Sequence, residues 1–312
     1  MSKNSFVIGV DVGGSHILSG AVELRSGTLI KDSLFEQKID NKATRELILS
    51  DWSRTINKTL ACIPNESVVG IGFAMPGAFN YKTGLALFEG NEKYEALYDC
   101  DVPGSLGPLL TSGDLDMRFL NDATSFAVGE AWQGAAAGKS KAISITLGTG
   151  FGSAFVHDGI PVTTGDTVPE HGCLWHLPFL EGIGDDYFST RWFVNRYKDL
   201  TGQTISGAKD VHDLAVNGDP KAAGMFQEFG RHMASFIAPW VRKFHPEVLV
   251  MGGNISRAWD LVADPFHRQL KQEGLALEVR VSTLKEHAAL LGSARLFDEE
   301  SWPHIQAVLT EF

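Results

Sequence analysis

The chain carries one pattern twice: an apolar strand, a turn rich in glycine, and a second strand. The first copy spans residues 6–24 and the second spans residues 142–156, each at a similar distance into its own half of the chain. Glycine tolerates backbone conformations that other residues avoid, and it lets backbone N–H groups come close to an anion. The duplication therefore predicts an α/β protein built from two related βββαβα halves.

Composition narrows the class of protein. A chain of 312 residues with 44% hydrophobic residues is long enough for two cores, which predicts two domains. Its net charge of -11 argues against a nucleic-acid surface, because phosphate backbones are bound by an excess of lysine and arginine. We therefore expect no nucleic-acid partner.

The cysteines and the apolar segments indicate where the protein works. The three cysteines, Cys62, Cys100 and Cys173, lie too far apart for a disulfide framework or a four-cysteine zinc site, which fits a reducing compartment. No stretch approaches the roughly 20 apolar residues of a membrane span, and the first residues run into a strand without a leader pattern. We expect a cytoplasmic protein with no membrane partner.

The first glycine turn follows an apolar strand that ends in a carboxylate. Asp11 must be solvated, paired or close to a metal ion, because an isolated charge in an apolar strand is costly. The turn after it, with Gly13, Gly14 and Ser15, has the composition of a phosphate-binding loop, but a hairpin closed by glycines is often only a hairpin. Both interpretations remain open on these residues alone.

Asp122 stands between a short strand at 117–120 and a helix at 123–137. Ligands of open α/β sheets bind at the carboxyl ends of strands, which makes this carboxylate a candidate catalytic base. The alternative is that Asp122 only caps the helix, since aspartate is among the commonest N-cap residues.

Two further glycine turns follow strands. The turn Gly148-Thr149-Gly150-Phe151-Gly152 does not fit G-x-G-x-x-G, because its third glycine comes one residue early, and the chain contains no P-loop. Rossmann-type dinucleotide binding is therefore not expected. The strand at 247–251 ends in Gly252-Gly253-Asn254 before a helix, where Asn254 either caps the helix or helps to form an anion site.

The remaining elements are mainly structural. We expect a third strand near 28–37, a strand at 67–74, and loops with short strands over an open face at 78–116. One helix at 44–62 has an apolar stripe formed by Ile48, Trp52, Ile56 and Leu60. Later helices are expected at 188–197, 211–215, 222–244 and 301–312.

Pro239 should kink or divide the helix at 222–244. A group of aromatic residues in the later helices fits either a core or a dimer face, and we favour the core for most of them. These residues are Trp192, Phe193, Phe226, Phe229, Phe236 and Trp240.

The glycine turns and the carboxylates at strand ends, in this order and spacing, resemble the ROK family of sugar kinases in the actin-like ATPase superfamily. The matching pieces are Asp11-Val12-Gly13-Gly14-Ser15, Pro76-Gly77, Asn121-Asp122, Gly148-Thr149-Gly150-Phe151-Gly152 and Gly252-Gly253-Asn254-Ile255. The resemblance implies two ribonuclease-H-like domains with an active-site cleft between them. We place the first domain at 1–120, rejoined by a C-terminal helix at 296–312, and the second at 121–295.

The resemblance also implies roles for the matching residues. Asp122 would accept the proton of a sugar hydroxyl as that oxygen attacks the γ-phosphate of ATP, with Asn121 and Gly77 at the sugar and Mg²⁺ near Asp11 through water. The residues implied to bind ATP are Asp11, Gly13, Gly14, Ser15, Gly148, Thr149, Gly150, Gly252, Gly253 and Asn254. Relatives of this family are often dimers, and a homodimer is expected.

One segment departs from the family pattern. ROK proteins usually carry Glu-x-Gly-His and a zinc motif of three cysteines, whereas this chain has Glu170-His171-Gly172-Cys173 and lacks the cysteine motif. Residues 182–189 take its place, so that Asp185 would replace a sugar-binding glutamate, and Glu170 would still contact the sugar. His176 would either contact the sugar or be a buried histidine paired to backbone. We expect no structural zinc.

The expected function is an ATP-dependent sugar kinase, with glucose as the first candidate substrate. An N-acetylhexosamine kinase for N-acetylglucosamine or N-acetylmannosamine is the alternative, and a non-catalytic sugar sensor is a third reading. Regulators of the family carry a helix-turn-helix before the first strand, whereas here that strand starts at Phe6.

Overall fold

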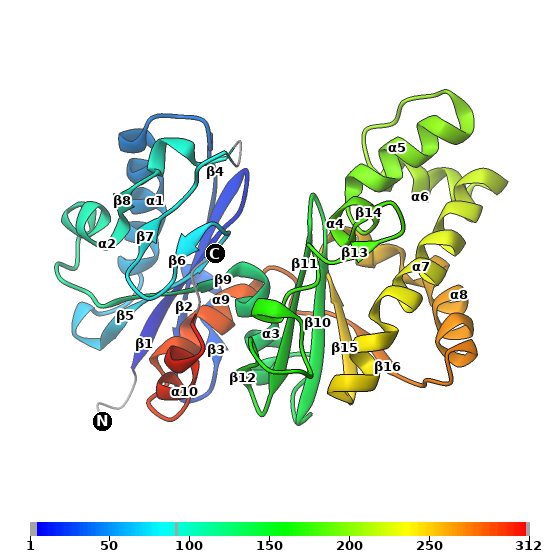
Figure 1. The fold of residues 1–312 in the computed structure, drawn as a ribbon. Helices are drawn as coiled ribbons and strands as arrows, with labels where there is room; N and C mark the ends of the chain where they lie inside the picture. The colour runs from blue at the N-terminus through cyan, green and yellow to red at the C-terminus, as the bar shows by residue number, and fades with distance from the viewer. Residues whose placement is uncertain (1–4, 91–92, 310–312) are drawn as a thin grey trace. The chain divides into compact units, whose positions relative to one another are not determined.

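The computed structural model describes residues 5–90 and 93–309, and it divides into two compact units. The first unit comprises Met1–Ala137, Gly159–Pro161 and Glu286–Phe312, and the second comprises Gly138–Asp158 and Val162–Lys285. Each unit is a mixed α/β structure with its own sheet, as the duplicated pattern predicts (Figure 1). Among the described residues, no helix is both long enough and apolar enough to span a bilayer.

The first unit is built on a six-stranded sheet of order β3-β2-β1-β5-β9, in which β4 also pairs with β2. β1 pairs antiparallel with β2 and parallel with β5, and β5 pairs parallel with β9. The strands are β1 (Phe6–Val12), β2 (His16–Glu23), β3 (Thr28–Leu29), β4 (Phe35–Lys38), β5 (Val68–Met75) and β9 (Met117–Asn121). The predicted hairpin and the two strands that follow it are confirmed, except that the third strand is interrupted by a 3-10 turn at Lys31–Ser33.

Helices cover both faces of this sheet. Ser19 of β2 hydrogen-bonds α1, since its Oγ lies 3.2 Å from the carbonyl oxygen of Thr55. A Cβ on the next residue, Gly20, would instead lie 3.4 Å from Leu290 of α9. Successive residues of a strand face opposite sides, so α1 and α9 lie on opposite faces. The helices of this unit are α1 (Arg45–Leu60), α2 (Val102–Leu106), α3 (Asp122–Gln133), α9 (His287–Ala294) and α10 (Trp302–Ala307).

Glycines let α9 approach both the sheet and α3 at backbone distance. A Cβ on Gly72 of β5 would lie 2.0 Å from the carbonyl oxygen of Ser293, and a Cβ on Gly129 of α3 would lie 1.9 Å from that of Ala288. Any side chain at these positions would force the helix away. The position of α3, and so of the residue at its start, is therefore set by close packing against α9.

A small sheet lies outside the main one, in the segment for which only loops and short strands were predicted. It has the order β6-β7-β8. Its strands are β6 (Phe79–Asn80), β7 (Leu85–Ala86) and β8 (Cys100–Asp101). Phe79 and Phe119 lie in contact, with ring centroids 5.1 Å apart, so this sheet packs on β9. The short strand β12 (Ile160–Pro161) also falls in the first unit.

The second unit repeats the hairpin. β10 pairs antiparallel with β11 and parallel with β15, and β15 pairs parallel with β16. Its strands are β10 (Lys141–Leu147), β11 (Phe151–His157), β13 (Pro178–Phe179), β14 (Gly182–Ile183), β15 (Val248–Gly252) and β16 (Glu278–Val281). Its helices are α4 (Gly184–Tyr187), α5 (Thr190–Thr201), α6 (Ala208–Val216), α7 (Pro220–Phe244) and α8 (Trp259–Gln272).

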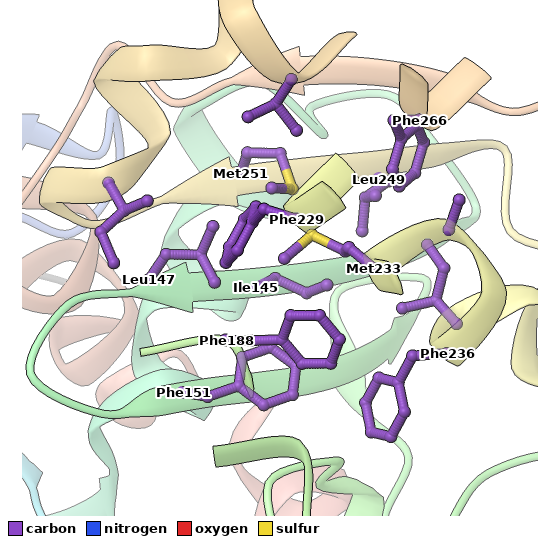
Figure 2. Close-up of a cluster of buried hydrophobic side chains, with 14 of the residues drawn as sticks. Ile145, Leu147, Phe151, Phe188, Phe229, Met233, Phe236, Leu249, Met251 and Phe266 are labelled. Carbon is purple, nitrogen blue, oxygen red and sulfur yellow. The ribbon is translucent and has the colours of Figure 1, made fainter. Parts of the chain in front are cut away.

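The long helix α7 forms the core of this unit with the sheet. In Figure 2, Phe229 and Met233 of α7 lie against Ile145 of β10 and Met251 of β15. The aromatic residues of the later helices belong to the core, which is the interpretation that the sequence favours. Buried are Trp192, Phe193, Phe226, Phe229 and Phe236, and the partly buried Trp240 packs against this core. α7 continues through Pro239, so the helix is not divided there, and buried residues lie on both sides of the proline. The kink that was the other predicted outcome stays a prediction.

The last helix ends at Ala307, before the predicted end at residue 312. The predicted C-terminal helix spans Trp302–Ala307, and residues 310–312 lie outside the described residues. The compact-unit division assigns α3 and α9 to the first unit, whereas the sequence analysis placed both in the second domain. The predicted boundary after residue 120 stays a prediction.

Candidate active site

Asp122 is the first residue of α3 and does not cap it. The N-cap is Asn121, whose Oδ1 accepts a hydrogen bond from the backbone N–H of Thr124 at 3.1 Å. The prediction that Asp122 occupies the cap position is therefore wrong by one residue, because the cap is decided by backbone geometry at the strand end. The interpretation of Asp122 as only a helix cap is therefore also wrong.

One oxygen of Asp122 is held by its neighbours. Oδ1 accepts hydrogen bonds from the backbone N–H of Ala123 at 2.7 Å and from Nδ2 of Asn121 at 3.1 Å. Burial raises the pKa of Asp122 above its ordinary value, and these bonds and the charge of Lys93 oppose that rise only in part. A partly buried carboxylate with a raised pKa is a better proton acceptor than an exposed one.

The amide of Asn121 is already engaged within the protein. Its Nδ2 lies 3.3 Å from the hydroxyl of Tyr81, and that hydroxyl donates to the carbonyl oxygen of Met75 at 3.2 Å. These bonds join the ends of β5 and β9, next to Gly77, which follows β5 by two residues. They fix the orientation of Asn121, whose predicted contact with a sugar hydroxyl stays a prediction.

Asp11 interacts electrostatically with two other carboxylates of the first unit. It lies in β1, where its register partners are Leu18 of β2 and Ala74 of β5. Burial raises the pKa of Asp11 to about 8, and the negative charges of Asp122 and Glu286 add to the rise. Glu286 precedes α9 and carried no sequence signal, since it reaches the site only through the packing of that helix. The structure thus brings together two of the predicted residues and one that was missed.

The first glycine turn is held from outside by two side chains. The hydroxyl of Tyr94 donates to the carbonyl oxygen of Gly13, and Nδ2 of Asn41 donates to that of Gly14. The N–H of Gly13 donates to the carbonyl oxygen of His16 at 2.9 Å. Within residues 5–90 and 93–309, the N–H groups of Gly14 and Ser15 donate to no protein acceptor. A turn with fixed carbonyls and two free N–H groups suits an anion.

The second glycine turn is tied to α4 and to the first turn of α5. The backbone N–H and Oγ1 of Thr190 both donate to the carbonyl oxygen of Gly148 at 2.8 Å. On the other side, Oδ1 of Asp185 accepts the backbone N–H of Phe151 at 2.7 Å, and Oδ2 pairs with the guanidinium of Arg191. The space around a Cβ on Gly148 is open to 4 Å, which leaves room for a ligand.

Asp185 therefore supports the turn through Oδ1, while its Oδ2 pairs with Arg191. The predicted contact of Asp185 with the sugar stays a prediction. Arg191 was missed because nothing in its local sequence marks it, and its pairing with Asp185 became visible only in the folded chain.

The third glycine turn is packed against β10. Gly253 has a φ of 79°, and a Cβ there would lie 2.3 Å from the carbonyl oxygen of Leu147. Gly253 is the N-cap of the 3-10 turn Asn254–Ala258, so Asn254 is not the cap that the sequence left as one possibility. Asn254 is exposed and available to a ligand.

The segment that departs from the family pattern forms a 3-10 turn at Glu170–Gly172 and the hairpin of β13 and β14. The side chain of Glu170 is 80% exposed and lies 3.8 Å from Nε2 of His171. The Sγ of Cys173 lies 3.6 Å from Nδ1 of His176, and burial raises the pKa of the Cys173 thiol to about 11, so it stays protonated near neutral pH. In the described part of the chain, no three His, Cys, Asp or Glu side chains are grouped as a metal site.

Two αβ units, each with a hairpin closed by glycines beside parallel strands, define the actin-like ATPase fold. The model of the ROK family matches residues 7–300. The chain belongs to the ROK family.

Relatives with assigned activities are similar over most of their length. The glucokinase of Thermotoga maritima is 26% identical over 325 residues, which cover 94% of this chain and 97% of that protein. The N-acetyl-D-glucosamine kinase of Haemophilus influenzae is 29% identical over 273 residues, covering 80% and 84% respectively. A Streptomyces griseus ROK family glucokinase, solved with glucose and AMPPNP, has the same fold, with a TM-score of 0.74, 23% identity, and coverage of 94% of this chain and 99% of that one.

Proposed function

We propose that this protein is an ATP-dependent sugar kinase that transfers the γ-phosphoryl group of ATP to a hexose hydroxyl, the 6-hydroxyl of glucose in the first instance. The observation that carries the proposal is Asp122, a partly buried carboxylate at the end of β9 that the helix does not need as a cap. The names of the relatives, glucokinase and N-acetyl-D-glucosamine kinase, support the same class of reaction.

Asp122 is proposed to act through its Oδ2. Among the described residues, the hydrogen bonds that Asp122 accepts from Asn121 and Ala123 both go to Oδ1, so we propose that Oδ2 faces the substrate. The sugar hydroxyl would give its proton to Oδ2 as its oxygen forms a bond to the γ-phosphorus, while the bond from that phosphorus to the bridging oxygen breaks and ADP leaves. An alcohol needs such an acceptor because its own pKa lies far above 7.

The glycine turns are proposed to bind the phosphates. In the first unit, the N–H groups of Gly14 and Ser15, which have no acceptor among the described residues, are proposed to bind an anion, with Gly13 in the same turn and Asp11 in the strand before it. In the second unit, Gly148, Thr149 and Gly150 would do the same, and Gly252, Gly253 and Asn254 would lie near the nucleoside. Holding phosphates in line accounts for most of the catalysis expected of a kinase.

We propose that Mg²⁺ binds near Asp11. Burial is the main cause of the raised pKa of Asp11, the charges of Asp122 and Glu286 add to it, and a divalent cation would offset their repulsion of the Asp11 carboxylate. Mg²⁺ usually keeps several waters and needs only one or two carboxylates besides the phosphates, which agrees with Asp11 acting through water. When bound, the ion supplies charge neutralisation for the transferred group.

Glu170 and His176 of the second unit, and Asn121 and Gly77 of the first, are proposed as sugar contacts. Asp185 is proposed to act mainly through the second glycine turn, where its Oδ1 accepts the N–H of Phe151. The carboxylate of Glu170 is 80% exposed, so besides its contact with His171 it can accept hydrogen bonds from sugar hydroxyls. N-acetylhexosamine is the alternative substrate class, because one relative is an N-acetyl-D-glucosamine kinase.

The test is an assay of ADP release from purified protein with Mg²⁺ and ATP against a panel of hexoses and N-acetylhexosamines. Saturable release with glucose is expected. A response to an N-acetylhexosamine alone would keep the kinase and change its substrate. Absence of any sugar-dependent release, with sugar binding still detected by calorimetry, would contradict the kinase proposal and favour a sensor.

A further inference from the structure

Lys93 lies against the first glycine turn. A Cβ placed on Gly14 would be 3.3 Å from Nζ of Lys93, 3.5 Å from its Cε and 3.6 Å from its Cδ, so the end of the lysine side chain runs along this glycine. A larger residue at Gly14 would crowd the ammonium. Lys93 lies in the segment at 78–116, where no motif in the sequence indicates a functional residue.

The neighbour of Lys93 fixes this placement. Tyr94 is fully buried, and its ring lies 5.7 Å from that of Trp52 and 5.5 Å from that of Phe88. Its backbone N–H donates to the carbonyl oxygen of Asn41 at 2.8 Å, and its hydroxyl donates to the carbonyl oxygen of Gly13. Tyr94 therefore anchors this segment to the first glycine turn. As a consequence, the side chain of Lys93, the preceding residue, lies against Gly14.

The ammonium of Lys93 has no close anionic partner in the described part of the chain. The charge of Lys93 acts on Asp122. However, no carboxylate oxygen among the described residues lies within 4.0 Å of the Lys93 ammonium, the distance that defines an ion pair. The two backbone N–H groups at Gly14 and Ser15 are also without protein acceptors in the same described ranges. One ammonium and two backbone N–H groups thus gather at this turn without an acceptor among the described residues, an arrangement that favours an oxyanion.

We propose that Lys93 binds the transferred phosphoryl group at the first glycine turn. The inference rests on the proposed kinase function. Its ammonium would contact an oxygen of the γ-phosphate while Asp122 accepts the proton of the sugar hydroxyl. Negative charge that builds up on the phosphoryl oxygens would be stabilised by a cation already in place. An acidic group on a sugar could supply the same kind of oxyanion. The test below distinguishes the γ-phosphate of ATP from such an acidic sugar.

The experiment compares Lys93→Met with the native chain and with Lys93→Arg. We expect Lys93→Met to lower kcat by about 10- to 100-fold with the KM for the sugar changed by less than about twofold. Lys93→Arg should recover part of the loss because it keeps the charge. The matched control is Lys82→Met, an exposed lysine of the same unit that should leave both constants unchanged.

Binding measurements locate the contact on the nucleotide. By calorimetry with Mg²⁺, Lys93→Met should weaken AMPPNP by about tenfold and ADP much less, since only AMPPNP has a γ-phosphoryl group. Equal kcat and equal AMPPNP affinity in Lys93→Met would overturn the role of Lys93 and leave the kinase proposal standing. A KM effect confined to acidic sugars, such as glucuronate, would assign the lysine to the substrate and would also overturn the inference.

The two proposals fail separately. A native chain that phosphorylates no sugar contradicts the kinase function, and Lys93 is then judged by AMPPNP binding alone. Weaker AMPPNP binding in Lys93→Met would still support a phosphate-binding lysine. Absence of AMPPNP binding by the native chain would overturn both.

Discussion

Gly129 of α3 and Gly292 of α9 lie so close that a Cβ on Gly129 would be 3.0 Å from the backbone nitrogen of Gly292. The same Cβ would lie 1.9 Å from the carbonyl oxygen of Ala288, which no real structure permits without a shift. Since α3 starts at Asp122, this contact between helix backbones determines where the candidate base stands.

Gly129→Ala should destabilise the protein. The added methyl group must push α3 from α9, and overpacking of this kind costs about 1–3 kcal/mol or more in free energy of unfolding. Urea denaturation measures the change. The control is Gly224→Ala in α7, an exposed glycine with open space around its Cβ, which should stabilise by about 0.5–1 kcal/mol. Equal effects of the two substitutions would show that the contact is not the cause.

Asp122→Asn should abolish most of the turnover while sugar binding persists. The amide keeps an oxygen for the N–H of Ala123 but cannot take a proton, so kcat should fall by about 10²- to 10⁴-fold. The ADP-release assay measures kcat, and calorimetry measures sugar affinity. Asp114→Asn, at an exposed position of the same unit, serves as the control. Turnover within about twofold of the native value would remove Asp122 from the mechanism.

Stability should depend on the protonation of Asp11. The folded protein holds this proton up to a pKa of about 8, whereas the ordinary value is 3.8, so the folded state binds more protons between those values. The free energy of unfolding must then fall as pH rises through that window, by at most about 1.4 kcal/mol per pH unit from this group.

Asp11→Asn removes this contribution. The raised pKa of Asp122 acts with the same sign, so the variant should lose only part of the slope. Urea unfolding at several pH values, without nucleotide or Mg²⁺, gives the difference between native protein and variant. We expect that difference to shift steadily in favour of the variant as pH rises. A difference that is constant with pH would contradict the raised pKa.

Asp185→Ala should weaken ATP more than sugar. The substitution removes the acceptor of the Phe151 N–H and the partner of Arg191, so the second glycine turn loses one of its supports. Loss of a hydrogen bond to a charged group is expected to raise the KM for ATP by about tenfold. Asp199→Ala, exposed in α5, is the control. A larger rise in the sugar KM would instead support the sugar contact that the sequence predicts for Asp185.

Protein purified without chelator should contain fewer than about one zinc per ten chains, because a structural zinc site needs four ligands. Cys173 and His176 are in contact at 3.6 Å but supply only two. Elemental analysis gives the zinc content, and Cys173→Ser should leave it unchanged. Stoichiometric zinc that is lost in Cys173→Ser would show that this segment does bind metal.

Much of the fold followed from local sequence. The apolar strands at β1 and β10, and the glycine turns that join each to its antiparallel partner, were predicted because backbone freedom and alternating burial are properties of neighbouring residues. The duplication of that hairpin identified the fold class, and the order of the turns identified the family. Both are confirmed.

The role of a residue could be inferred only from the tertiary structure when that residue contacts a distant part of the chain. Sequence alone could not decide between Asn121 and Asp122 as the cap of α3, since one residue of strand geometry separates them. Nothing in the local sequence indicates Lys93 beside Gly14 or Glu286 near Asp11, because the fold brings the segment between β7 and β8 to the first glycine turn and the start of α9 near β1. The sequence determined where glycines and carboxylates end the strands, and the fold decided which charges surround them, because electrostatic contact depends on distance in space.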